Sequence, residues 1–357
     1  MVQRKSEAMA AVDRLLGSEQ PSSQATVGFA YGISPATKSI DTNSIAHVRI
    51  LLGSQEQRVV LSGIAALRSM LHAPRAVLDL MTKANIGLSK RVADEAMMLF
   101  AFDNNVLRTQ TTEADVGKLL TKLQELDELD GHWIEEFLSE ASQSQGEKCA
   151  EFFMSRVDRA SESNNWELRP CNHGPYGHVP LKFRKSPDFP RIFSKVVNWL
   201  YQNSGKGLLF HTRSAELFIT MITPFDAEFV QVLKQLSATA TETELDAIGR
   251  ILGEAPSWVV WTERDFVLQF LPRCRQFGDE CYRRASSHLL GAAISGMRSG
   301  VPGEPFERDL KMRDAAREAL QEIPRFAPGY DLYEDLLKFA ETEIRQQEKE
   351  GEYLDDE

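Results

Sequence analysis

A thiol and two imidazoles, from Cys171, His173 and His178, occur within eight residues of one another. Cysteine sulfur and histidine nitrogen are ligands that zinc prefers in proteins, and zinc needs three or four of them. Gly174 and Gly177 would let the backbone wrap around an ion. The three side chains therefore form a candidate metal site, for which no fourth ligand is apparent. The alternative is a buried cysteine and two loop histidines bonded to backbone carbonyls, with no cofactor at all.

Basic and aromatic side chains alternate in the same stretch of the chain. The candidate partner-binding residues there are Trp166, Arg169, Tyr176, Lys182, Arg184 and Lys185. Cationic groups interleaved with aromatic rings can hold an acidic peptide, or a phosphate backbone with stacked bases. The alternative is that the rings anchor the segment to neighbouring helices while the charges remain solvated.

A dense apolar group follows Pro256, where Trp258, Val259, Val260 and Trp261 are consecutive. Buried, this group would be a wedge between helices. Exposed, it would be a hot spot for a protein partner, because aromatic side chains dominate such spots. Both tryptophans are therefore candidate partner-binding residues.

Signatures of common enzymes do not occur in the sequence. It contains no GxxxxGK[ST] phosphate loop, no HExxH pair, no GxSxG elbow and no paired CxxC sets. Cys274 and Cys281 straddle a predicted turn and could form a thiol pair, but core packing is a simpler explanation. These observations disfavour an enzyme and leave catalytic residues unassigned.

Apolar residues recur at the spacing that places them on one face of a helix, as in Val116, Leu119, Leu120 and Leu123. Breaks at glycine and proline divide this pattern into many short helices. The predicted helices cover about 3–16, 43–53, 55–72, 75–84, 88–102, 112–127, 131–143, 147–161, 189–203, 212–223, 226–239, 242–253, 263–276, 279–297, 307–322 and 330–348.

Helix start signals accompany several of these segments. Ser54 with Gln57, and Thr241 with Glu244, have the spacing of a capping box, in which the first side chain accepts a hydrogen bond from the backbone of the second. Asp226 stands at another predicted start. Short helices joined by short turns pack as antiparallel neighbours.

Internal similarity favours stacking of these helices over a closed bundle. RVVLSGIAAL (58–67) and RVADEAMMLF (91–100) share a pattern 33 residues apart, and RRASSHLLGAA (283–293) and MRDAAREALQEI (312–323) repeat it about 30 residues apart. An early arginine, small residues and a leucine-rich end resemble the second helix of a HEAT repeat. The resemblance implies an all-α, α-α superhelix of the HEAT or armadillo type, and it implies no catalytic or cofactor residue.

One segment lacks helical periodicity. Residues 163–188 contain four prolines and two glycines, and an irregular stretch of this length is more often functional when ordered. We therefore predict an N-terminal helical lobe at 1–162, an irregular basic loop at 163–188, and a C-terminal helical lobe at 189–357 that ends in an acidic tail.

The balance of charged residues limits the classes of partner that are expected. Of 357 residues, 41 are basic and 52 acidic, which gives a net charge of -11 and disfavours nucleic acid and anionic membranes. Without a signal peptide pattern, a long apolar run or a disulfide framework, the sequence predicts a soluble cytoplasmic protein. Its expected function is a protein–protein interaction module or scaffold, with the recognition part of a larger bacterial assembly as one form. The alternatives are a metal-dependent enzyme or zinc site at 166–185, and nucleic-acid binding through the basic loop.

Overall fold

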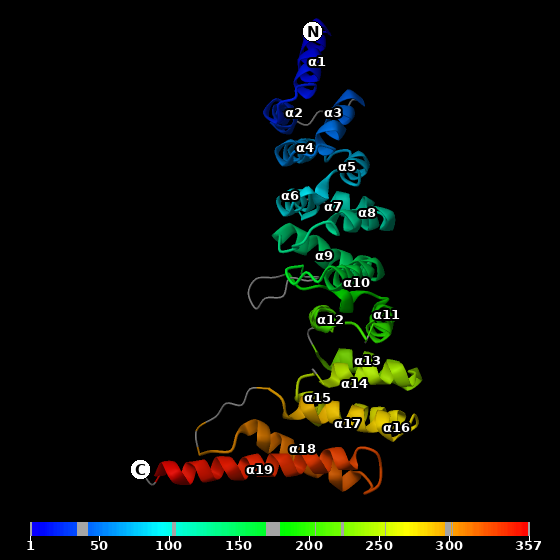
Figure 1. Ribbon diagram of the computed structural model, residues 1–357, viewed down its shortest axis with the longest axis vertical. Coiled ribbons are helices and arrows are strands. Elements are labelled where there is room, and N and C mark those ends of the chain that lie inside the picture. Colours follow the sequence, from blue (N-terminus) through cyan, green and yellow to red (C-terminus); the bar gives the residue numbers. More distant parts are fainter. Residues whose placement is uncertain are drawn as a thin grey trace. The chain divides into compact units, whose positions relative to one another are not determined.

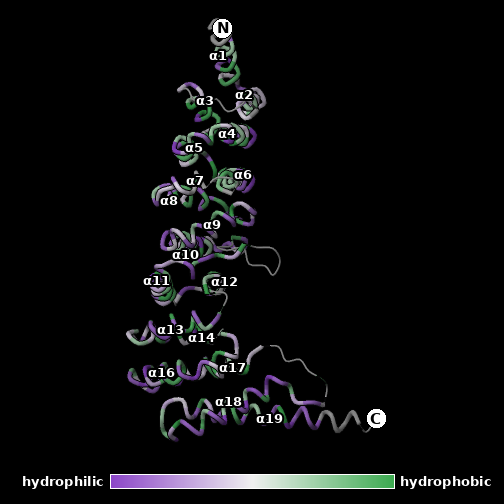
Figure 2. Tube along the Cα trace, turned by 180° about the vertical axis from the view of Figure 1, so that it is seen from behind, coloured by the Kyte–Doolittle hydropathy of each residue, from purple (hydrophilic) through white to green (hydrophobic). Residues whose placement is uncertain are grey.

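The computed structural model describes residues 2–33, 42–101, 105–168, 179–203, 205–222, 225–253, 255–296, 301 and 303–355. Throughout these ranges the regular structure is helical and contains no strand, which confirms the all-α class. Hydrophobic and hydrophilic positions alternate along the coils of the helices (Figure 2). This is expected of helices that bury one face.

Contacts divide the chain into two compact units. Unit 1 comprises Met1–Phe189 and Lys206–Met221, and unit 2 comprises Pro190–Gly205 and Ile222–Glu357. The predicted division into lobes on either side of the 163–188 loop stays a prediction.

Unit 1 contains two rows of helices that pack side by side. Its elements are α1 (Val2–Leu16), α2 (Pro21–Ile33), α3 (Thr42–Leu52), α4 (Gln57–Ser69), α5 (Pro74–Met81), η1 (Ile86–Leu88), α6 (Lys90–Ala101), α7 (Asn105–Gln110), α8 (Glu113–Leu123), α9 (His132–Ser144), α10 (Gly146–Ser163), η2 (Phe183–Lys185) and α12 (Leu208–Ile222). In one row, α2, α4, α6 and α9 contact each other in that order (Figure 1). In the other row, α3 contacts α5, α5 contacts α7, and α8 contacts α10. The two similar stretches 58–67 and 91–100 thus lie in neighbouring helices, α4 and α6.

Polar side chains connect helices about 40 residues apart in unit 1. Asp94 of α6 accepts hydrogen bonds from the backbone N–H groups of Trp133 (2.8 Å) and Ile134 (3.2 Å), which lie in the first turn of α9. Arg75 of α5 donates twice to Asp115 of α8, at 2.6 and 2.9 Å, and holds the pKa of this buried carboxyl well below its usual range. These bonds connect α6 with α9 and α5 with α8.

Two glycines allow α2 and α4 to approach closely. A Cβ atom at Gly28 would collide with both the side chain and the backbone of Ser62, and one at Gly32 would lie 2.9 Å from the carbonyl oxygen of Ala65. Real Cβ atoms do not approach a backbone oxygen so closely. The spacing of four residues puts both glycines on the face of α2 that contacts α4.

Unit 2 is also built from helices that pack on one another. Its elements are α11 (Phe189–Gln202), α13 (Ala227–Thr239), α14 (Glu242–Gly253), α15 (Trp258–Thr262), α16 (Arg264–Arg275), α17 (Asp279–Ile294), α18 (Glu307–Glu322) and α19 (Tyr330–Asp355). Helix α14 packs on α17, α13 and α17 pack on α16, and α19 packs on both α17 and α18. The similar stretches 283–293 and 312–323 lie in α17 and α18.

The predicted helix starts are partly confirmed. Thr241 and Glu244 form a reciprocal capping box, since the Thr241 N–H donates to Glu244 Oε2 at 2.8 Å and the Glu244 N–H donates to Thr241 Oγ1 at 3.4 Å. Asp226 Oδ1 accepts from the Phe229 N–H at 3.0 Å. The box predicted at Ser54 is wrong, because α4 begins at Gln57 and the Ser54 hydroxyl instead accepts from the Glu56 N–H.

Candidate functional site

The predicted metal ligands Cys171, His173 and His178 lie outside the described residues, as do Arg169 and Tyr176. Within the described ranges, His, Cys, Asp and Glu side chains form no group of three or more that could hold a metal ion. The metal site at the loop therefore stays a prediction.

Residues 179–182 of the loop lie along α9. The Val179 N–H donates to Glu135 Oε2 at 3.2 Å, the Ser139 hydroxyl donates to the Pro180 carbonyl at 2.7 Å, and the Lys182 N–H donates to the Ser142 hydroxyl at 2.7 Å. The three α9 residues, 135, 139 and 142, have the spacing of one helix face. This face fixes the backbone of residues 179–182, which we call the strap.

The predicted binding residues of the loop are in different environments. Lys182 is half-buried and forms an ion pair with Glu140 of α9. Arg184 is half-buried and Lys185 is exposed, while Phe183 between them is buried with its ring edge-on to Phe153. Phe183, next to the strap, therefore anchors this segment to neighbouring helices. A partner that binds Arg184 or Lys185 stays a prediction.

The predicted binding tryptophans belong to different units. Trp166 of unit 1 is half-exposed, and its carbonyl accepts a hydrogen bond from Arg213. In unit 2, Trp258 and Trp261 are half-buried, and the guanidinium of Arg308 lies 5.7 Å from the centre of the Trp261 ring. Arg308 also donates to the Ala293 carbonyl at 2.8 Å, so its stacking on Trp261 is part of the internal packing.

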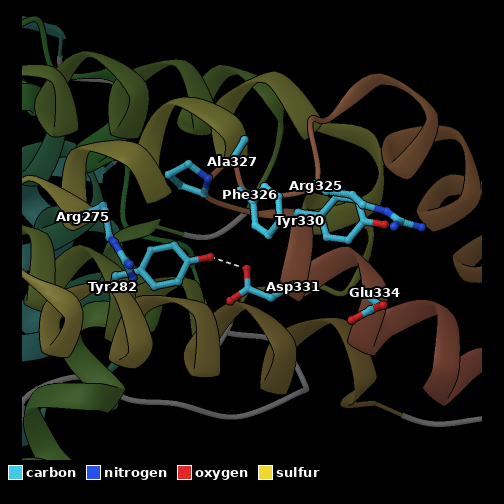
Figure 3. Close-up of a pocket in the computed structure, with 9 residues that line it drawn as sticks. Arg275, Tyr282, Arg325, Phe326, Ala327, Tyr330, Asp331 and Glu334 are labelled. Atoms are coloured by element: carbon cyan, nitrogen blue, oxygen red, sulfur yellow. Dashed lines mark hydrogen bonds between the residues drawn. The ribbon is translucent and has the colours of Figure 1, made fainter.

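A cavity of about 600 Å³ opens in unit 2, where the α16–α17 turn and the α18–α19 loop meet (Figure 3). Arg275 and Tyr282 enter it from α16 and α17. Arg325 and Phe326 enter it from the loop, and Asp331 from the first turn of α19. This cavity is the candidate functional site.

Tyr282 holds the loop of this site in place. Its hydroxyl donates to Asp331 Oδ1 and accepts from the Gly329 N–H at 3.0 Å. Gly329 has a φ of +102°, a conformation that L-residues with side chains rarely adopt. Burial raises the pKa of Tyr282 to about 12, so the phenol stays protonated at neutral pH. It acts as a fixed hydrogen-bond donor in this site, and not as a base.

The rim of the site combines cationic and aromatic groups. The Arg275 guanidinium lies 5.0 Å from the centre of the Tyr282 ring and pairs with Asp279 at 3.2 Å. Phe326 is 100% exposed, and Arg325 beside it is exposed and has no ion pair within the described residues. Tyrosine, arginine and exposed aromatic side chains around one cavity are the composition of a protein-binding hot spot.

The sequence reasoning did not select Arg325 or Phe326. A signal was present, because Pro324 and the Pro328-Gly329 pair bracket a short loop that contains an aromatic residue. The helix predicted at 307–322 ends next to this loop. A single phenylalanine in a sequence does not indicate whether its side chain is buried.

Comparison with known proteins finds no family model, no curated protein and no solved structure that matches the chain. A search of the described helices also finds none that is long and apolar enough to cross a membrane.

Proposed function

We propose that the chain is a protein-interaction scaffold built from HEAT-like stacked helix pairs, and that a protein partner docks on unit 2 at the cavity beside Arg325 and Phe326. The stacking is supported by the two rows of helices in unit 1 and by the contacts between α4 and α6, which contain similar sequences. Arrays of this type use extended surfaces for binding and need no catalytic residue.

The exposure of Phe326 is the observation that carries this proposal. Leaving a large apolar side chain in water forfeits about 1.5–3 kcal/mol relative to burying it. The loop that contains this residue is held at its C-terminal end, where Tyr282 binds Gly329 and Asp331. Because these bonds hold the backbone beside the exposed phenylalanine, docking of a partner orders little backbone.

The test is a binding measurement on paired variants. A partner that co-purifies with the full chain is prepared separately, and its Kd is measured by calorimetry for the wild type, Phe326→Ala and Tyr201→Ala. Tyr201 is the matched control, since it is an aromatic residue of unit 2 that is 44% exposed and does not line the cavity.

A hot-spot aromatic costs about 2 kcal/mol or more on truncation, so Phe326→Ala should weaken binding by about 30-fold. Tyr201→Ala should change the Kd by less than about three-fold. Equal effects of the two substitutions, or none from Phe326→Ala, would show that the partner docks elsewhere.

A further inference from the structure

A second and smaller cavity, of about 190 Å³, lies in unit 1 between α6, α8 and α9. Its walls include Met97 and Phe100 of α6, Val116 of α8 and Phe137 of α9. These side chains are almost entirely buried, and the Phe100 and Phe137 rings are 5.3 Å apart. The volume is below the usual range of pockets for drug-sized ligands, and it suits a group the size of one amino-acid side chain.

Two carboxylates lie at the rim of this apolar cavity. Glu136 and Glu140 both line it and are four residues apart, so they occupy the same face of α9. Glu140 is paired with Lys182 of the strap, whereas Glu136 has no ion pair within the described residues. The described lining includes no lysine or arginine. Glu136 therefore gives the described part of the rim a negative charge that no described cation neutralises.

We propose that this cavity binds a primary ammonium or guanidinium group on a short alkyl stem, with the stem against Met97 and Phe137 and the cation at Glu136 and Glu140. Contact between an apolar stem and the apolar walls removes both surfaces from water, which favours binding. A cationic tip offsets the repulsion between two like charges one helical turn apart. A neutral ligand would desolvate the carboxylates without compensation, and an anion would be repelled.

Lys182 competes with such a ligand, because its ammonium already occupies one of the two carboxylates. Removal of this ammonium should make the rim more negative and strengthen binding of an external cation. Removal of the Glu136 charge should weaken it. If Lys182 and Glu136 had only a structural role, their removal would not change the affinity for the cation in opposite directions.

The probe is n-pentylammonium, and the readout is the 13C-labelled methyl group of Met97, whose NMR signal is assigned with a Met97→Leu variant. Binding is expected as a saturable shift of this signal in the full chain, with n-pentanol, the neutral analogue, binding at least about five-fold more weakly. Both ligands are titrated into the wild-type protein, so the comparison of n-pentylammonium with n-pentanol does not depend on a variant. Nα-acetyl-lysine methylamide is titrated in parallel, since tighter binding than n-pentylammonium identifies a peptide side chain as the source and weaker binding identifies a free amine.

The variants give the decisive result. Glu136→Gln should weaken n-pentylammonium binding by about five-fold, Lys182→Met should strengthen it by a similar factor, and Glu162→Gln, an exposed carboxylate elsewhere in unit 1, should leave it unchanged. The proposal is overturned if neither cation shifts the Met97 signal, if n-pentanol binds as well as n-pentylammonium, or if Lys182→Met and Glu136→Gln act in the same direction.

Discussion

Arg156 of α10 is the largest fully buried side chain of unit 1, and its replacement by methionine removes a buried charge while keeping most of the side-chain length. The guanidinium donates to the Leu126 carbonyl at 2.6 Å and to the Asp127 carbonyl at 2.9 Å. Both carbonyls belong to the segment that follows α8. Arg156→Met would leave both carbonyls without these donors, and the bond to Leu126 lies in the buried interior.

The expected cost follows from these two bonds. A hydrogen bond to a charged group contributes about 1.5–3 kcal/mol, so the loss of two should lower the free energy of unfolding of unit 1 by about 3 kcal/mol. Arg159 is the matched control, because it lies one turn further along α10 and is partly exposed, where it pairs with Asp127 Oδ1 at 2.9 Å and donates to the Gln124 carbonyl at 2.5 Å. Arg159→Met should cost about 0.5 kcal/mol, as for other solvated ion pairs.

Hydrogen exchange of peptides from α8 and α10 is the suitable assay, because the two units can unfold separately and a whole-chain transition would mix them. Arg156→Met should accelerate exchange of the slowest amides more than 100-fold, and Arg159→Met by about two-fold. If Arg156→Met changed the free energy of opening by less than about 1 kcal/mol, or no more than Arg159→Met, the buried guanidinium would not have the role assigned to it.

Three further predictions concern other parts of the chain. Gly28→Ala should lower the free energy of unfolding by about 1–3 kcal/mol because its methyl group collides with α4. Gly117→Ala in α8, where the nearest atom to a new Cβ is 3.8 Å away, should raise it by about 0.5–1 kcal/mol; hydrogen exchange of unit 1 peptides distinguishes the two variants. The folded-state pKa of Asp115 lies below its ordinary value of 3.8, so its ion pair stabilises the fold fully above that value and is lost as pH falls through the lowered pKa. The free energy of unfolding should therefore fall less steeply in acid for Asp115→Asn than for the wild type. Parallel curves of this free energy against pH would contradict the prediction. Cys274 and Cys281 are buried and burial raises both thiol pKa values, so a thiol reagent should label them only in denaturant; labelling of the native protein would mean that this turn opens readily.

Most of the helices could be predicted from apolar spacing, because a helix that buries one face must repeat that pattern. Helix α2 was missed. Its sequence begins at Pro21 with polar residues and contains Gly28 and Gly32, which have poor helix propensity. The structure shows the reason for these glycines, since they allow close contact with α4. Tertiary packing decided this element, and local preference alone did not reveal it.

The candidate site was harder to predict for a related reason. The sequence indicated the basic loop, where charged and aromatic residues are dense, but residues 169–178 of that loop lie outside the described residues and Phe183 in the rest is buried. Phe326 is a single residue in a short loop. Its importance depends on exposure and on the hydrogen bonds of Tyr282, which connect residues 47 and 49 positions apart. Neither property can be seen in local composition.

Photo-crosslinking from position 326 tests partner docking at this cavity most directly. A benzophenone amino acid placed at position 326 of the full chain in cells, with the same group at position 201 as the control, reports which proteins lie within its reach. The proposed docking predicts one discrete adduct from position 326 that is absent from position 201 and disappears with Arg325→Ala. Identical adduct patterns from the two positions, or none from position 326 when a stoichiometric partner co-purifies, would contradict it.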